Sequence, residues 1–280
     1  MKASLKIIVA AALVLLALSI GAQARAQAAN QSKEKEYCFV APILPDKVGD
    51  MRAFWKDVST NNASALDNYM RSIGQDRLLE FQQNLPGGTF LVTYVKETSG
   101  IGPTFKENRK LGTPIAKYVR DRFADFIGYD FTAPQNAPNV EKVWEWKDTN
   151  RTAPSKRQAV FAIPVKPGKA NDLKRFYGEL SGPRKNEEAQ HLRYQTISKI
   201  EAFLQHRTEG DYLVQYIESD EPLDVVMQRA VSAGTPIADY IRTQLADLTS
   251  VDLANPAPNI QPLYDWSASK GVQAAAAPLT

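Results

Sequence analysis

The chain has 280 residues, of which 44% are hydrophobic, and a formal net charge of +3 at pH 7. This length is enough for two domains of ordinary size, and the lone Cys38 excludes an internal disulfide, so the fold relies on its hydrophobic core. The excess charge lies in residues 1–28, where Lys2, Lys6 and Arg25 stand without an acidic residue. The rest of the chain is formally neutral, which argues against nucleic acid as a partner.

Residues 1–28 have the pattern of a secretory signal. Two lysines precede an uncharged, almost wholly apolar run at 7–20, and small-residue cleavage patterns follow at 22–24 and 26–28. The run is short for a bilayer span, and no later segment is apolar enough to cross a membrane. We therefore expect a periplasmic or secreted protein that leaves the membrane after cleavage. An uncleaved anchor is the alternative.

After a first strand at 37–43, the chain has a helical pattern that starts at Val48 and runs, as one helix or two, to about Met70. Two strands near 77–83 and 89–96 follow, joined by a Pro-Gly-Gly turn. A further helix begins at Thr113, a favourable N-cap, with proline at the first helical position. The last predicted strand contains residues 143–146.

The same order of elements returns in the second half. At an offset of 122 residues, residues 38–131 align with 160–253 without a gap, and the clearest shared block is GTPIA at 112–116 and 234–238. Sequence similarity between the two halves over a segment of this length indicates a duplicated module. The predicted organisation is a first module at 36–147, a polar linker at 148–157, a second module at 158–267 and an Ala- and Ser-rich tail at 268–280, expected to be disordered.

The order β-α-β-β-α-β in each module is the ferredoxin-like arrangement of the α+β class. The third strand, at 90–95 and 212–217, is apolar on both faces, so both faces need cover. The helices cover one face, and the sheet of the sister module is the simplest cover for the other. We predict two tandem modules whose antiparallel sheets pack into a single-chain α/β barrel, a pseudo-dimer that needs no partner.

The second module carries a family resemblance. Its segments KPGK at 166–169, IEAFLQ at 200–205 and EGDYLV at 209–214 resemble the dimeric α/β-barrel superfamily, and more narrowly a bacterial family of unestablished function. The first copy departs from it, with Gly-Gly-Thr at 87–89 where the second has Glu-Gly-Asp. The superfamily implies pockets between sheet and helices. Its members include cofactor-free monooxygenases, haem enzymes and binding modules, so the resemblance implies a fold more than a reaction.

Polar residues retained by both copies are the candidates for ligand binding. Arginine, glutamine and tyrosine beside a barrel pocket can orient an oxygenated aromatic molecule or a carboxylate. The alternative is a structural role, with tyrosines as tethered core aromatics and charged residues as ion pairs. The candidates are Arg71, Gln83, Tyr94, Tyr118, Asp125, Arg193, Gln205, Tyr216, Tyr240 and Asp247.

The two histidines, His191 and His206, both lie in the second module, where the first has Tyr69 and Asn84. Each is a candidate axial haem ligand or general base, and the alternative is a surface or hydrogen-bonded histidine. No further metal ligands stand at a recognisable spacing, so we expect no metal site and no cofactor, with haem as the alternative.

Three functions stay open on this basis. The leading hypothesis is an exported protein that binds a small, largely apolar molecule in its barrel pockets, with cofactor-independent, monooxygenase-like catalysis left open. The second is a haem-associated enzyme that uses a histidine of the second module. The third is a non-catalytic structural or interaction protein with filled pockets.

Overall fold

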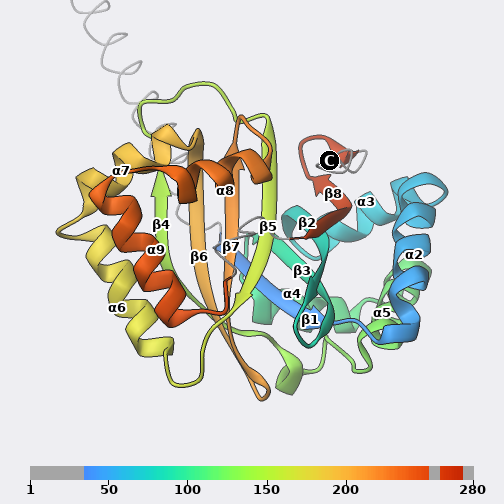
Figure 1. Cartoon of the computed structure of the whole chain (residues 1–280). Helices are drawn as coiled ribbons and strands as arrows, with labels where there is room; N and C mark the ends of the chain where they lie inside the picture. Colours follow the sequence, from blue (N-terminus) through green and yellow to red (C-terminus); the bar gives the residue numbers. More distant parts are fainter. Residues whose placement is uncertain (1–34, 252–258, 274–280) are drawn as a thin grey trace, which may run out of the picture.

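A computed structural model describes residues 35–251 and 259–273. The expected signal at 1–28 and residues 274–280 of the expected tail therefore lie outside the described residues. Two antiparallel sheets pack against each other, and the helices lie on their outer sides (Figure 1). No helix in the described ranges is long and apolar enough to cross a membrane.

The first half of the chain contains the predicted strands and helices, plus one helix that was not predicted. Its elements are β1 (Lys35–Pro42), η1 (Pro45–Lys47), α2 (Val48–Thr60), α3 (Ala63–Ser72), β2 (Gln75–Leu85), β3 (Gly88–Glu97), α4 (Ile101–Lys110), α5 (Pro114–Ile127), η2 (Pro134–Asn136) and β4 (Asn139–Lys147).

The second half repeats this order. Its elements are β5 (Arg157–Pro164), α6 (Ala170–Ser181), α7 (Lys185–Tyr194), β6 (Ile197–Arg207), β7 (Gly210–Ser219), α8 (Leu223–Ser232), α9 (Pro236–Leu248), β8 (Ile260–Ser267) and β9 (Gly271–Gln273). The unpredicted helices α4 and α8 occupy matching places, so both copies share the same addition.

The helices α5 and α9 begin as the sequence predicts. The hydroxyl oxygens of Thr113 and Thr235 accept hydrogen bonds from the backbone N–H groups of Ala116 (3.4 Å) and Ala238 (3.3 Å). Proline at the first position of each helix removes a backbone N–H that would otherwise be unpaired.

A shared arginine ties each unpredicted helix to its neighbour. Arg120 of α5 donates to the carbonyl oxygens of Asn108 (2.7 Å) and Leu111 (2.9 Å), where α4 ends. Arg242 of α9 does the same at the end of α8, to the carbonyl oxygens of Val231 (2.7 Å) and Ala233 (3.1 Å). The carbonyls that a helix end leaves unpaired thereby find a charged donor.

The last strand of each module joins the sheet of the other module. The strand orders are β1-β3-β2-β8-β9 and β4-β6-β7-β5, so β8 pairs with β2 and β4 pairs with β6. The β-α-β-β-α-β order in the chain is confirmed, but neither copy completes its own sheet. The exchanged strands bring aromatic rings with them: Tyr264 stacks on Trp55 at 4.1 Å, and Trp144 stacks on Tyr177 at 5.3 Å.

The expectation of a disordered tail is wrong for its first part. β9 pairs with β8, with Val272 opposite Trp266, and Val272 packs against the core of the first module. An apolar side chain that finds a core to pack against can hold a short terminal segment in place.

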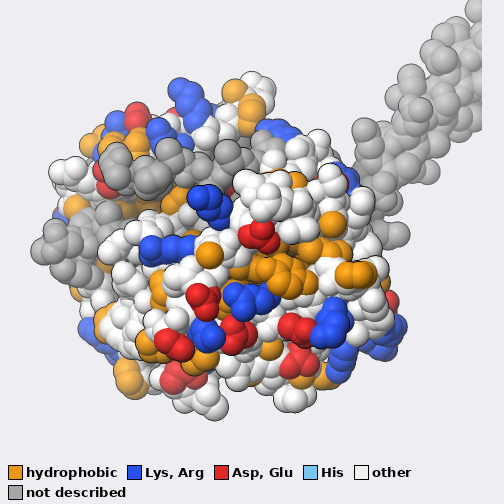
Figure 2. Space-filling view, turned by 90° about the vertical axis from the view of Figure 1, so that its right-hand side faces the viewer, with side chains coloured by type: hydrophobic (Ala, Val, Ile, Leu, Met, Phe, Trp, Pro, Cys, Tyr) orange, Lys and Arg blue, Asp and Glu red, His pale blue; other side chains and the backbone are white. Residues whose placement is uncertain are grey.

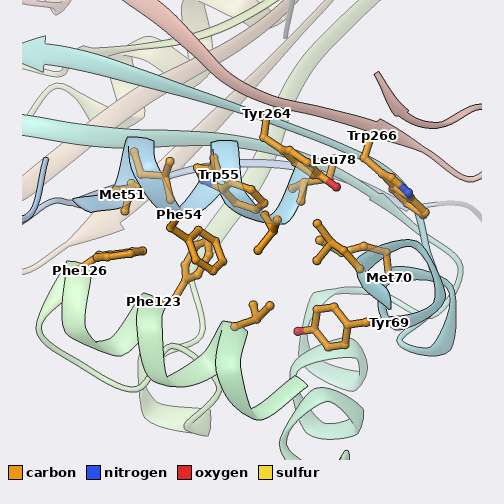
Figure 3. Packing of buried hydrophobic residues seen from close by; sticks show 14 of the residues in the cluster. Met51, Phe54, Trp55, Tyr69, Met70, Leu78, Phe123, Phe126, Tyr264 and Trp266 are labelled. Atoms are coloured by element: carbon orange, nitrogen blue, oxygen red, sulfur yellow. The ribbon is translucent and has the colours of Figure 1, made fainter. Parts of the chain in front are cut away.

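Three apolar clusters hold the molecule together. One lies between the helices and sheet of the first module, where rings from α2, α3, α5 and β8 face one another (Figure 3). A second lies at the matching place in the second module, and the third fills the space between the two sheets. In the third, Tyr94 stacks on Tyr216 with ring centroids 4.0 Å apart, and Cys38 is fully buried. This packing confirms the predicted α+β barrel of two sheets.

On the outer surface of the first module, basic and acidic side chains are interspersed around an apolar area (Figure 2). Neither sign dominates this face, which agrees with the balanced charge of the chain outside residues 1–28.

Candidate functional site

Each module encloses a cavity between its helices and the outer face of its sheet. Cavity 1, in the first module, has a volume of about 490 Å³, and cavity 2, in the second, about 330 Å³. The hairpin turn of the opposite copy borders each one: residues 205–209 border cavity 1, and residues 83–86 border cavity 2. The duplicated architecture thus produces two partly open, largely apolar sites of the size that small-molecule ligands occupy.

Cavity 1 has an apolar wall and a polar floor. The wall includes rings from Trp55 and Phe123, and Figure 3 shows both pointing into the region between α2, α3 and α5. The floor is formed by Glu80 of β2 and Thr93 of β3, which lie directly opposite each other across the strand pair, and by Gln75. All three floor residues are buried.

The floor of cavity 1 has unsatisfied hydrogen-bonding atoms. Within the described ranges, Glu80 Oε2, Thr93 Oγ1 and Gln75 Oε1 have no hydrogen-bond partner. Buried polar atoms in folded proteins are nearly always paired with protein or water. Three such atoms at the edge of one cavity indicate a place where a polar group is held.

Burial also sets the charge of the floor. It raises the pKa of the Glu80 carboxyl to about 8, although the neighbouring Trp55 indole acts in the opposite direction. The carboxyl is therefore largely protonated at pH 7. In this form it both donates and accepts a hydrogen bond.

Cavity 2 has the same apolar wall but different polar groups. Glu188 and His191 of α7 line it, together with Gln215 of β7, whose Nε2 donates to the Tyr177 hydroxyl (3.1 Å). Burial raises the pKa of Glu188 to about 7. Burial and the charge of Arg242 lower the pKa of His191 to about 4, so its ring is neutral at pH 7.

The polar groups of the two cavities are not equivalent in the repeat. Glu80 and Thr93 of cavity 1 correspond to Ala202 and Gln215, whereas Glu188 and His191 of cavity 2 correspond to Leu66 and Tyr69. The duplicated cavities therefore differ in where they carry an acid: on the sheet in cavity 1 and on a helix in cavity 2.

The two candidate glutamines join the two sheets. The Gln83 amide donates to the carbonyl oxygen of Ala162 (2.9 Å) and accepts from its N–H (2.8 Å). The Gln205 amide makes the symmetric pair with Val40, donating at 3.1 Å and accepting at 2.6 Å. Both amides are fully engaged with backbone, which gives the two residues a structural role, although each also borders a cavity.

The candidate tyrosines of the third strands, Tyr94 and Tyr216, lie between the sheets and line neither cavity. The Tyr94 hydroxyl donates to Glu36 (2.9 Å), and the Tyr216 hydroxyl donates to Glu218 (2.8 Å). Glu36 also pairs with Lys199 (2.8 Å), beside the fully buried Glu201. Burial and the nearby Glu36 raise the pKa of Glu201 to about 7.

The other six candidates do not line either cavity. Four are in ion pairs: Arg71 with Asp67 (2.9 Å), Asp125 with Lys47 (2.9 Å), Arg193 with Asp148 (3.2 Å) and Asp247 with Lys169 (2.8 Å). The Tyr118 ring is partly exposed beside Phe54, and the Tyr240 hydroxyl donates to Glu179 (2.5 Å). The structure therefore does not gather the ten candidates at one site.

The two histidines have different surroundings. His206 has Nδ1 2.8 Å from Asp211 and Nε2 3.4 Å from Glu141, so neither ring nitrogen is free to bind haem iron. The hydrogen bond with Asp211 raises the pKa of His206. His206 borders cavity 1 and His191 lines cavity 2, so His191 is the histidine whose ring has neither of these contacts. The described ranges contain no cluster of three or more His, Cys, Asp or Glu side chains that could hold a metal ion.

No protein-family model matches the chain, and no curated protein matches it. Among solved structures, an anthrone oxidase-like protein is similar over 88% of this chain and 97% of its own, with 12% identity and a TM-score of 0.45. A candidate monooxygenase from Fusobacterium nucleatum subsp. nucleatum ATCC 25586 matches 86% of this chain and 96% of its own, with 11% identity and a TM-score of 0.43. One from Lactobacillus acidophilus NCFM matches 86% and 98%, with 8% identity and a TM-score of 0.43. Two packed sheets with outer helices are present here within a single chain.

Proposed function

We propose that the protein binds a small, largely apolar molecule with one neutral polar group in cavity 1. The observation that carries this proposal is the buried Glu80 carboxyl, whose Oε2 has no partner in the described ranges at the floor of a cavity of about 490 Å³. A carboxyl that is largely protonated at pH 7 favours a hydroxyl or carbonyl over an anion. The aromatic or alicyclic part of such a ligand would pack against the apolar wall of the cavity.

A calorimetric titration with 2-naphthol, a neutral aromatic alcohol, tests this proposal. Val95→Phe fills cavity 1, and Ile217→Phe makes the matched change at the equivalent position in cavity 2. We expect Val95→Phe to abolish one binding event that Ile217→Phe retains. Glu80→Leu should weaken the same event by roughly tenfold, as expected for one lost hydrogen bond. Equal affinity in the wild type, Val95→Phe and Glu80→Leu would contradict the proposal.

Cofactor-independent catalysis would use the same carboxyl. Glu80 is a cavity 1 group able to exchange a proton near neutral pH, and a general base works best when its pKa lies near the working pH. If the bound ligand has a weakly acidic C–H group, the ionised Glu80 carboxylate can accept that proton and return it, or a solvent deuteron, to the same carbon. Solvent deuterium incorporation into a bound ligand, absent in Glu80→Gln, is the test.

We also propose that the protein is exported, on the evidence of residues 1–28 alone. Fractionation of expressing cells and N-terminal sequencing of the product test this. The expected product is found outside the cytoplasm and begins after residue 24 or 28. A full-length N-terminus in the membrane fraction would support the anchor instead.

A further inference from the structure

Cavity 2 contains a buried pair of titratable groups that ligand binding in cavity 1 does not use. Glu188 and His191 are three residues apart on α7, so their side chains lie on one face of that helix. Both line cavity 2, and their exposed fractions are 4% and 5%. Within the described ranges, Glu188 Oε2 has no hydrogen-bond partner. A buried oxygen left unpaired at the edge of a cavity points to a ligand or a solvent molecule there.

The neighbouring polar groups leave this pair free for a ligand. From α9, Arg242 donates to the carbonyl oxygens of Val231 and Ala233 and is paired with Asp239. From β7, Gln215 donates its amide N–H to the Tyr177 hydroxyl of α6. Both α6 and α9 pack against α7, and Gln215 lines the same cavity from β7.

The chemistry of the pair matches one functional group. A neutral imidazole has one ring nitrogen that accepts a hydrogen bond, and a protonated carboxyl has an O–H that donates one. A hydroxyl group on a ligand can donate to the first and accept from the second at the same time. The apolar wall, with Phe161, Phe176 and Ile217, suits a planar hydrocarbon body.

We propose that cavity 2 is a second ligand site, specific for a phenol or enol, in which His191 accepts from the ligand hydroxyl and Glu188 donates to it. This site goes beyond the proposed function of cavity 1, because it uses other residues, another element and another donor–acceptor arrangement. The corresponding Leu66 and Tyr69 of the first module cannot reproduce it.

The site predicts a pH dependence with a definite sign. Glu188 donates only while protonated, and burial places its pKa at about 7. Phenol affinity should therefore fall as the pH rises from 6 to 8. His191, with a pKa of about 4, stays a neutral acceptor over that range.

The test compares 4-fluorophenol with 4-fluorotoluene, which has a methyl group in place of the hydroxyl, by fluorine NMR titration. The background is Val95→Phe, so that cavity 1 is filled. We expect 4-fluorophenol to bind more tightly than 4-fluorotoluene. His191→Phe and Glu188→Leu should each weaken 4-fluorophenol by roughly tenfold and leave 4-fluorotoluene unchanged. His206→Asn, which places the first module's residue at the other histidine, is the matched control and should change neither.

Several results would overturn the site. They are equal binding of the two probes, equal 4-fluorophenol affinity in the parent and both cavity 2 variants, or a ligand-induced shift in the proton NMR signals of His206 and not of His191. If Glu188→Leu fails to fold, Glu188→Gln keeps the shape and should remove the pH dependence. Failure of cavity 1 to bind 2-naphthol would leave these expectations unchanged, so the two proposals fail separately.

Discussion

Replacing Glu80 by glutamine removes an ionisable proton from the floor of cavity 1 and keeps the shape of the side chain. In the unfolded chain this carboxyl loses its proton near the ordinary pKa of 4.5, whereas burial in the folded protein raises the pKa to about 8. Between these values the folded state binds one more proton than the unfolded state. The free energy of unfolding therefore falls as the pH rises, by about 1.4 kcal/mol for each pH unit.

The size of the effect follows from the two pKa values. The Glu80 contribution is fully present below pH 4.5 and is lost by about pH 8, a total of about 5 kcal/mol. Glu80→Gln has no proton to lose, so its stability should not follow this fall. Glu97, Glu188 and Glu201 have raised pKa values of about 7, but they are present in both proteins and cancel in the difference.

Urea denaturation followed by tryptophan fluorescence, at intervals from pH 4 to pH 9, measures this difference. We expect the two proteins to be similar in stability at pH 4 and Glu80→Gln to be the more stable by several kcal/mol at pH 8. Glu107→Gln, on the exposed side of α4, is the control for replacing a carboxylate by an amide, because the ion pair with Lys110 lowers rather than raises its pKa. A difference between Glu80→Gln and wild type that is constant across pH would refute a buried, protonated Glu80.

Three further predictions concern the scaffold. Gln83→Ala leaves the backbone N–H and carbonyl of Ala162 without their partner between the sheets, so it should lower the free energy of unfolding by on the order of 3 kcal/mol in urea denaturation. Gln205→Ala should cost less, because only the N–H of Val40 loses its partner while its carbonyl keeps a hydrogen bond from Arg207. Gln261→Ala, at an exposed position of β8, should have no such effect. Proton NMR of the histidine rings, assigned with His206→Asn, should show that His191 has a pKa of about 4 and that the pKa of His206 is above its ordinary value of 6.5. Two titrations near pH 6.5 would contradict the surroundings described for both rings. Thr113→Ala and Thr235→Ala should each cost about 1 kcal/mol of thermal or urea stability, and no loss at either position would show that the caps contribute nothing.

Most of the scaffold could be predicted because both halves of the sequence contain the same pattern of strands and helices. The helical stripe beginning at Val48 and the cap at Thr113 are local signals that a single copy already contains. The apolar third strand required a second sheet, and Tyr94 does stack on Tyr216 there. What the repeat could not indicate is which copy a strand joins. Self-similarity shows that β4 and β8 are equivalent strands. It does not show whether each strand pairs with the sheet of its own module or with the equivalent sheet of the other module.

The candidate site was harder to predict for a related reason. Retention in both copies is a signal for symmetric scaffold residues such as Gln83 and Gln205. The cavity acids differ between the copies, so this signal cannot indicate them. A signal existed for Glu80, which interrupts the apolar run Leu78-Leu79 and Phe81 in β2. A carboxyl side chain within an apolar strand of this kind is unusual, and it merits a functional explanation.

The exchange of the last strands has a consequence for how the chain reaches this structure. The pairing of Phe81 with Pro262 joins segments that lie most of the described chain apart, so the first sheet stays unfinished until nearly the whole chain has been synthesised. Pairing of such distant segments slows folding, because a long loop must close before the contact forms. The two halves look like independent units in sequence, yet each depends on the other for its last strand. Duplication here has produced one cooperative folding unit in place of two.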